Sequence, residues 1–225
     1  MNHGIGFRQR GFGFRSSMGF ARPTASTKGS IVSFGTMGAA GDWAKATTAG
    51  NLGIAFVCSN GTISAPTGWT LATPSSTNAE LWYKYPLSAD EPSADFSSSG
   101  SQLFVLLAEV SGTTSLDRSG LNSGQASSQS VSATANDAGG GEVIASLAYW
   151  NGSNTGGSVG SLSLTDGTGA NALSNSAAGL APAQTAQYYA ALLGVAGTAT
   201  PTQPDAAAAT LSVFSNGQMC IASFK

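Results

Sequence analysis

Charged side chains are scarce in this sequence. Lys, Arg, Asp and Glu together make up 9% of its residues, whereas soluble globular domains average about 25%. Gly, Ser, Thr, Ala and Asn fill the difference. A surface with few charges repels its neighbours only weakly. The composition therefore suits a subunit packed among other subunits, or a secreted protein that faces carbohydrate.

The residues that most often build catalytic and metal sites are nearly missing. The chain has one histidine, His3, and two cysteines, and it lacks the dinucleotide-binding glycine motif, the P-loop and any Cys/His metal spacing. Residues 156–160 match the G-x-S-x-G nucleophile elbow, but that elbow needs a helix after it and a histidine base. We interpret this match as a Gly-rich loop, and residues 166–169 as a turn rather than a calcium loop.

The acidic residues are too scattered to suggest glycoside hydrolysis, which needs two carboxylates about 5–10 Å apart. Glu109 and Glu142 adjoin apolar segments, and we expect both to lie at strand ends in water. The sequence therefore predicts a protein that is not an enzyme and needs no cofactor or metal.

Long hydrophobic runs are also missing. No segment approaches the ~18 apolar residues of a membrane helix, and the N-terminus lacks the apolar stretch of about 7–15 residues that a signal peptide needs. We expect a chain that is made in a cytoplasm and inserts in no membrane. Cys58 and Cys220 each sit in an apolar run, where a thiol behaves as a small buried hydrophobe. A disulfide between them remains the alternative.

Short strand patterns separated by turn signals fill residues 29–225. Apolar residues alternate in 51–58, and residues 102–110 form the most apolar run of the chain. Residues 187–195 fit a helix or a strand, and their short length favours a strand. Ser215-Asn216-Gly217 predicts a hairpin between residues 207–214 and 219–224.

About nine to eleven short strands without a long helix are typical of an all-β fold. We therefore predict an antiparallel β-sandwich of jelly-roll type, formed as a single domain by residues 29–225. Within it, residues 112–141 are rich in Ser, Thr, Gly and Asn, and offer one strand-like piece around Val131.

Residues 1–28 differ from the rest in charge. They contain five basic residues and no acid, whereas the remainder has four basic and eleven acidic residues, a net charge of −7. Glycines interrupt the segment and make its ordering costly, so we expect a disordered or extended arm until it binds a partner. The residues predicted to dock on another protein are Phe7, Arg8, Arg10, Phe12, Phe14, Arg15, Phe20 and Arg22.

Three interpretations of this arm are open: it binds nucleic acid, it stays a free tail, or it docks on a protein subunit. Arg with interleaved Phe and Gly resembles segments that bind nucleic acid, but the acidic body would be repelled by the same polyanion. A free solvated tail would gain nothing from its repeated Phe side chains. Docking on a neighbouring protein subunit uses both residue types, because Arg pairs with carboxylates and Phe fills pockets. A second copy of the acidic body could supply that surface.

The part of the chain that follows the arm resembles a known family. Five motifs occur in series: GNLGIAFV at residues 50–57, APTGWTL at 65–71, LWYK at 81–84, EPSADF at 91–96 and CIASFK at 220–225. In this order they resemble structural domains of tailed bacteriophages and prophages, found in minor tail, fibre and decoration proteins. The likeness covers residues 30–225 and does not include the arm.

This resemblance implies a β-sandwich built into a virion, and it supplies no catalytic residues. We expect a structural component of the head, neck or tail, assembled in the host bacterial cytoplasm, that binds other virion proteins and its own copies. The alternative is a carbohydrate-binding receptor module that stacks sugars of a host glycan on Trp43 or Trp150. Core packing is the competing interpretation for all four tryptophans, and Trp150 is the one we expect to be exposed.

Overall fold

The computed structural model describes residues 29–76, 78–132, 141–152, 155–181, 186–197 and 203–225. The predicted arm, residues 1–28, lies outside the described residues. In the described part the chain forms strands and no α-helix, and all strand pairs are antiparallel. Accordingly, these residues contain no helix that could cross a membrane.

The first sheet is built from the N-terminal half of the described chain. Its strands follow the order β1-β7-β2-β5-β4, and a short pair, β3 with β6, lies apart from it. The strands are β1 (Ser30–Phe34), β2 (Leu52–Ser59), β3 (Ile63–Ser64), β4 (Thr70–Leu71), β5 (Ala79–Lys84), β6 (Ser97–Ser98) and β7 (Leu103–Ser111).

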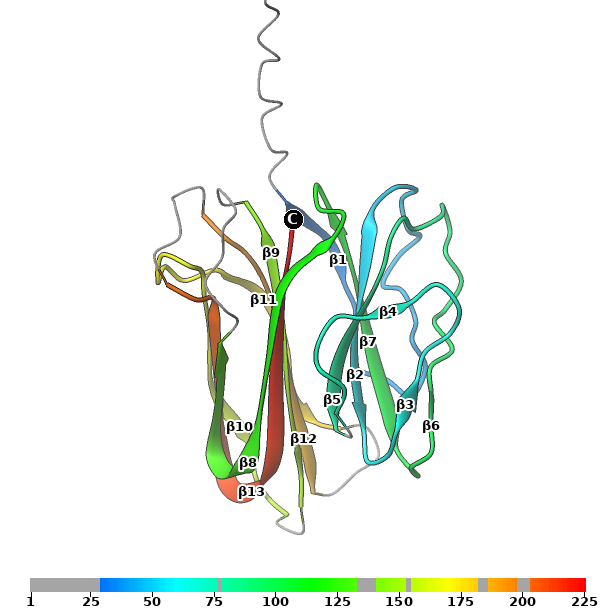
Figure 1. Ribbon diagram of the computed structural model, residues 1–225. Helices are drawn as coiled ribbons and strands as arrows, with labels where there is room; N and C mark the ends of the chain where they lie inside the picture. The colour runs from blue at the N-terminus through cyan, green and yellow to red at the C-terminus, as the bar shows by residue number, and fades with distance from the viewer. Residues whose placement is uncertain (1–28, 77, 133–140, 153–154, 182–185, 198–202) are drawn as a thin grey trace, which may run out of the picture.

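The second sheet is built from the C-terminal half. Its order is β10-β13-β9-β12-β11, and β8 pairs with β13. The strands are β8 (Leu116–Ser132), β9 (Val143–Asn151), β10 (Val159–Thr165), β11 (Leu173–Leu180), β12 (Gln187–Val195) and β13 (Ala206–Phe224). The chain thus completes one sheet before it begins the other, and the two halves lie side by side (Figure 1).

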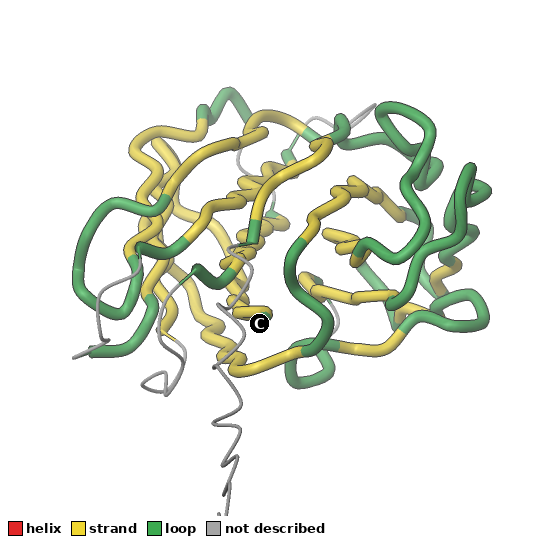
Figure 2. Tube along the Cα trace, turned by 90° about the horizontal axis from the view of Figure 1, so that it is seen from above, coloured by secondary structure: helices red, strands yellow, loops and turns green. Residues whose placement is uncertain are grey.

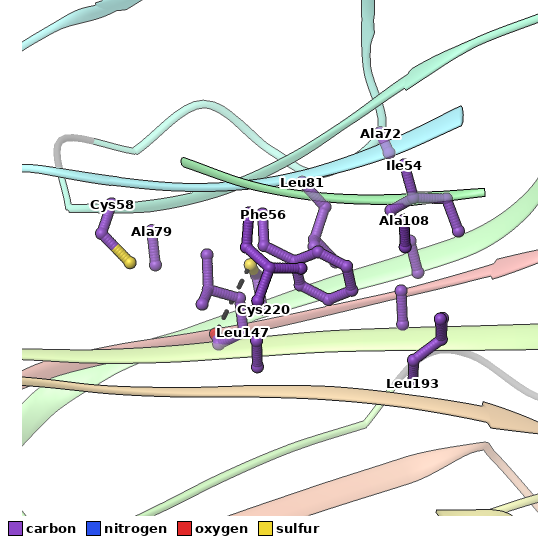
Figure 3. Packing of buried hydrophobic residues seen from close by; sticks show 14 of the residues in the cluster. Ile54, Phe56, Cys58, Ala72, Ala79, Leu81, Ala108, Leu147, Leu193 and Cys220 are labelled. Atoms are coloured by element: carbon purple, nitrogen blue, oxygen red, sulfur yellow. Dashed lines mark hydrogen bonds between the residues drawn. The ribbon is translucent and has the colours of Figure 1, made fainter. Parts of the chain in front are cut away.

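Apolar side chains from both sheets meet between them. Along β2, alternate residues from Leu52 to Cys58 point toward the second sheet, as their period of two predicts. Figure 3 shows Phe56 and Leu81 of the first sheet pointing toward Leu147 and Cys220 of the second. The predicted antiparallel β-sandwich is therefore confirmed.

Both cysteines belong to this core. Cys58 and Cys220 are free thiols and fully buried, which confirms their role as small hydrophobes. The Cys220 thiol donates a weak hydrogen bond to the Leu147 carbonyl, at 3.6 Å (Figure 3).

The opposite face of the second sheet is buried as well, because β8 and β13 both turn back on themselves. A hydrogen bond of 2.7 Å joins Asn122 Nδ2 to the Ser130 carbonyl within β8, although eight residues of extended strand span about 26 Å. The first half of β13 pairs with β10 and the second half with β9, with a register shift between Thr210 and Ser215.

A second hydrophobic cluster fills the space beneath this fold-over. Trp150 of β9 and Tyr188 of β12 pack there with Leu164 of β10 and Leu211 of β13. The structure therefore has three layers along this half: the first sheet, the middle strands, and an outer layer made of β10 with the folded-over halves of β8 and β13.

Two predictions about this region are wrong. Ser215-Asn216-Gly217 is no hairpin turn, because these residues lie inside the 19-residue strand β13. Residues 112–141 contain the 17-residue strand β8 rather than one short piece. Strand pairing on both sides of Asn216, with Asn151 and Gln125, outweighs the local turn preference of Asn-Gly.

Gly217 serves close packing instead of a turn. A Cβ there would lie 2.7 Å from Cδ1 of Trp150 and 2.9 Å from Nε2 of Gln129. Its cross-strand partner on β8, Gly124, has open space at the same position.

We predict that Gly217→Ala lowers the free energy of unfolding by about 1–3 kcal/mol, because the added methyl group overlaps the Trp150 ring. Gly124→Ala is the matched control and should leave stability unchanged or slightly raised. Urea unfolding followed by tryptophan fluorescence measures both. Equal effects of the two substitutions would contradict this role of Gly217.

Candidate functional site

Three tryptophans and a phenylalanine gather on the outer face of the first sheet. We call Trp43, Trp69, Trp82 and Phe96 the aromatic platform. The rings of Trp43 and Trp69 are stacked, with centroids 6.3 Å apart, and Phe96 meets Trp69 and Trp82 edge to face. The platform packs on apolar residues of β2 and β7 that face away from the second sheet.

Loops and strands together build the platform. Trp82 belongs to β5, whereas Trp43, Trp69 and Phe96 come from loops, which lie on the side of the first sheet away from the second (Figure 2). Gly53 of β2 gives the rings room, because a Cβ there would lie 2.9 Å from Trp43 and 3.4 Å from Trp69.

Hydrogen bonds fix two of the indoles. The Trp43 Nε1–H donates to the Pro92 carbonyl at 3.1 Å. The Trp82 Nε1–H donates to Glu80 Oε2 at 2.9 Å. Both rings are therefore held in one orientation although all three tryptophans stay partly exposed.

A depression of about 340 Å³ lies beside Trp43 and is lined by Phe34, Asp42 and neighbouring small residues. At its rim the Ser93 hydroxyl donates to Asp42 Oδ1 at 2.7 Å. The Trp43 ring can stack on a flat apolar group or on a cation, while the carboxylate of Asp42 beside it accepts hydrogen bonds.

Exposed carboxylates surround the platform. Among the described acidic residues, the exposed ones are Asp42, Asp90 and Asp95. Asp42 and Asp95 adjoin Trp43 and Phe96 in the chain, and the Asp90 backbone N–H donates to the Thr47 carbonyl in the loop after Trp43. Exposed negative charge and partly exposed aromatic rings therefore occupy the same loops of the first sheet.

Of the two residues predicted to stack on a glycan, Trp43 and Trp150, the structure leaves one partly exposed and buries the other. Trp43 is partly exposed at the depression, where it could contact a ligand. The expected exposure of Trp150 is wrong, because its side chain is fully buried beneath the outer layer. The predicted docking residues, Phe7, Arg8, Arg10, Phe12, Phe14, Arg15, Phe20 and Arg22, lie outside the described residues.

Glu109 and Glu142 were expected in water, and this prediction is wrong for both. Glu109 is fully buried. Its Oε1 accepts hydrogen bonds from the Thr48 backbone and from Asn51 Nδ2, at 2.9 and 2.6 Å. This carboxylate therefore ties the loop before β2 to β7, and its position reflects a structural role.

Glu142 belongs to a buried cluster of acids at the end of β9. It is 2% exposed, and neither of its carboxylate oxygens has a hydrogen-bond partner among the described residues. Burial raises the pKa of Glu142 to about 7, and repulsion from Asp117 and Asp205 adds to the rise. Lys225 and Arg118 oppose it.

Asp205 behaves in the same way. Burial raises its pKa to about 6, with the Ser223 hydroxyl opposing and the charge of Asp166 adding to the rise. No group of three or more His, Cys, Asp or Glu side chains in the described part of the chain is arranged to hold a metal ion. The buried carboxyl groups of this cluster make the stability of the fold depend on pH.

The hydrogen bonds around two other sequence motifs, residues 166–169 and the G-x-S-x-G match at 156–160, show what each of them forms. Asp166 Oδ1 accepts the backbone N–H groups of Thr168 and Ala170, which closes a turn and confirms that interpretation. Ser158, the centre of the G-x-S-x-G match, is followed by strand β10, and its backbone N–H donates to Ser212 Oγ at 2.8 Å. The strand–turn–helix context of a nucleophile elbow is not formed there.

We predict that the protein loses stability as the pH rises from about 4 to 7. The unfolded chain releases both protons at a pH of about 4, whereas the folded chain holds the Asp205 proton up to a pH of about 6 and the Glu142 proton up to about 7. The free energy of unfolding therefore falls by up to about 1.4 kcal/mol per pH unit for each group until the folded pKa of that group is passed. Glu142→Gln should flatten this dependence. Asp95→Asn, which removes an exposed carboxyl group, is the control and should keep the slope.

Urea unfolding at several pH values measures the slope directly. A free energy of unfolding that rises over this range, or an unchanged slope in Glu142→Gln, would contradict the buried state of Glu142.

The chain matches no protein-family model, no curated protein and no solved structure. Its likeness to structural domains of tailed phages therefore rests on the serial motifs of the sequence. The surfaces that can bind a partner are the aromatic platform, the exposed carboxylates around it, and the strands from β9 to β13, which carry few charged residues.

Proposed function

We propose that this protein is a non-enzymatic structural component of a tailed-phage virion, in the class of decoration, neck or minor tail proteins. Its basic, aromatic N-terminal arm anchors it to neighbouring subunits. Assembly takes place in the host bacterial cytoplasm, and the protein then remains in the virion with other head, neck or tail proteins.

One observation carries this proposal. Residues 143–224 contain only two charged residues, Asp166 and Asp205, and both are buried, at 3% and 0% exposure. The strands from β9 to β13 therefore present a surface without charge. Such a surface suits a permanent place among other subunits, because no charge has to lose its hydration when a neighbour covers it.

The first sheet offers a surface that complements the arm. Asp42, Asp90 and Asp95 supply carboxylates, and the aromatic platform supplies partly exposed rings. Arg side chains pair with carboxylates and stack on indoles, and Phe side chains fill apolar depressions. The arm of one copy would thus dock at the depression beside Trp43 of another copy.

The same platform favours a second candidate function, a carbohydrate-binding receptor module of a phage tail or fibre. Trp43 with the neighbouring Asp42 combines a partly exposed ring and a hydrogen-bond acceptor, which are the groups that bind a sugar ring. Trp150 has no part in this candidate because it is buried.

Deleting residues 2–22 should leave a folded β-sandwich that forms smaller assemblies than the full chain. The apolar clusters of the described structure are all built from later residues, so the deletion removes docking and leaves the core. Light scattering on a sizing column gives the masses, and circular dichroism checks the fold. Equal masses for the two chains, or an unfolded deletion variant, would contradict the proposal.

A substitution at Trp43 separates the two candidates. If the arm docks on the platform, Trp43→Ala should reduce assembly of the full chain as the deletion does. If the platform binds host glycans, the same variant should assemble normally and lose the response of tryptophan fluorescence to those glycans. Tyr85→Ala, which removes an exposed aromatic ring outside the platform, is the control for both measurements and should change neither.

A further inference from the structure

Strand β11 is an edge strand with a free side. It pairs with β12 and, in the part of the chain that the structure describes, with no other strand. The pairing is regular from Asn175 to Leu180, without a bulge. The free edge of a regular strand presents backbone N–H and C=O groups that can pair with another strand.

The hydrogen bonds of the ladder identify the outward groups. The Ala181 N–H donates to the Gln187 carbonyl at 2.8 Å, and in an antiparallel ladder every second residue bonds to the same neighbour. Ala177 and Gly179 therefore bond to β12, whereas Ser176, Ala178 and Leu180 direct their N–H and C=O groups away from it. Among the described residues, neither the strand pairings nor the backbone hydrogen bonds of loops and turns engage these outward groups.

The other edges of the two sheets carry features that discourage pairing. β4 has two residues. β1 and β10 are each interrupted by a register shift. Along β8, Asn122 Nδ2 bonds to the Ser130 carbonyl and Gln129 Nε2 to the Gly124 carbonyl, so the strand occupies backbone acceptors with its own side chains. β11 also has a register shift, between Leu173 and Asn175, but its six residues from Asn175 to Leu180 pair with β12 in unbroken register. This regular stretch is longer than any that β1, β4 or β10 offers at its edge.

Charge does not protect this edge either. No charged residue occurs between Asp166 and Asp205 in the sequence, whereas natural edge strands are commonly guarded by Lys or other charges. Leu180 is 50% exposed at the end of the strand. Two copies of β11 can therefore approach each other without repulsion and cover two exposed leucines.

We propose that β11 pairs antiparallel with β11 of a second copy, so that the middle sheet continues across a two-fold axis. An antiparallel pair of identical strands is self-complementary, which is the requirement for a closed two-fold interface. With the axis near Ala177, the outward groups of Ser176 face those of Ala178 of the partner subunit. This interface uses a different surface from the arm and is independent of it.

Amide hydrogen exchange of the full chain tests the pairing residue by residue. At concentrations where the chain associates, the amides of Ser176, Ala178 and Leu180 should exchange at least about tenfold more slowly than on dilution to the monomer. The amides of Ala177 and Gly179, bonded to β12, should stay protected at both concentrations. Protection of the outward amides that does not change on dilution would mean that the chain covers its own edge, and would overturn the proposal.

A charge variant gives the second test. Ser176→Lys combined with Ala178→Lys places four positive charges near one another across the axis, so the outward amides should lose their protection and the mass of the assembly should halve. Both side chains are exposed, so the fold is retained. Ser161→Lys with Ser163→Lys adds the same charges to an exposed face of β10 and should change neither property. An unchanged mass and protection in the β11 variant would overturn the interface, whether or not deletion of residues 2–22 affects assembly.

Discussion

The middle strands of this fold, β9, β12 and the second half of β13, carry apolar side chains on both faces. Both faces therefore have to be covered by other parts of the chain. Side chains of β9, β12 and the second half of β13 enter two separate clusters, one on each side of the sheet. The first sheet covers one face. The other face has to be covered from within the same half of the chain, which is why β8 and β13 turn back and lie over it with β10. Gly217 allows the close approach of Trp150 on which this second cluster depends.

This arrangement divides the surface into two chemically different parts. The exposed acids and the partly exposed tryptophans of the described chain lie on the loops of the first sheet and on β5, whereas the strands from β9 to β13 expose hydroxyl, amide and methyl groups. Charged groups attract partners from a distance and select among them. Uncharged edges and faces avoid the large cost of removing water from a charge, and a partner can hydrogen-bond to their polar groups. A subunit with both properties can be recruited through one side and packed through the other.

Prediction from the sequence succeeded where a residue's environment follows from its near neighbours. The alternation from Leu52 to Cys58 placed one face of β2 in the core, and the apolar surroundings of both cysteines indicated their burial. The aromatic platform was only partly predictable. Alternation places Trp82 on the face of its strand opposite Leu81 and Tyr83, but nothing local indicated that Trp43 and Trp69 would stack beside it.

Strand character and the concentration of positive charge in residues 1–28 were determined by the sequence itself, because each depends on local periodicity or composition. The tertiary structure decided which strands are buried on both faces. It buried Trp150, Glu109 and Glu142, and it extended β13 through the Asn216-Gly217 pair, since a second layer and two neighbouring strands act on those residues from distant parts of the chain. It also left β11 at an edge. Such long-range contacts outweigh local preferences because the apolar area they bury contributes more free energy than any single turn.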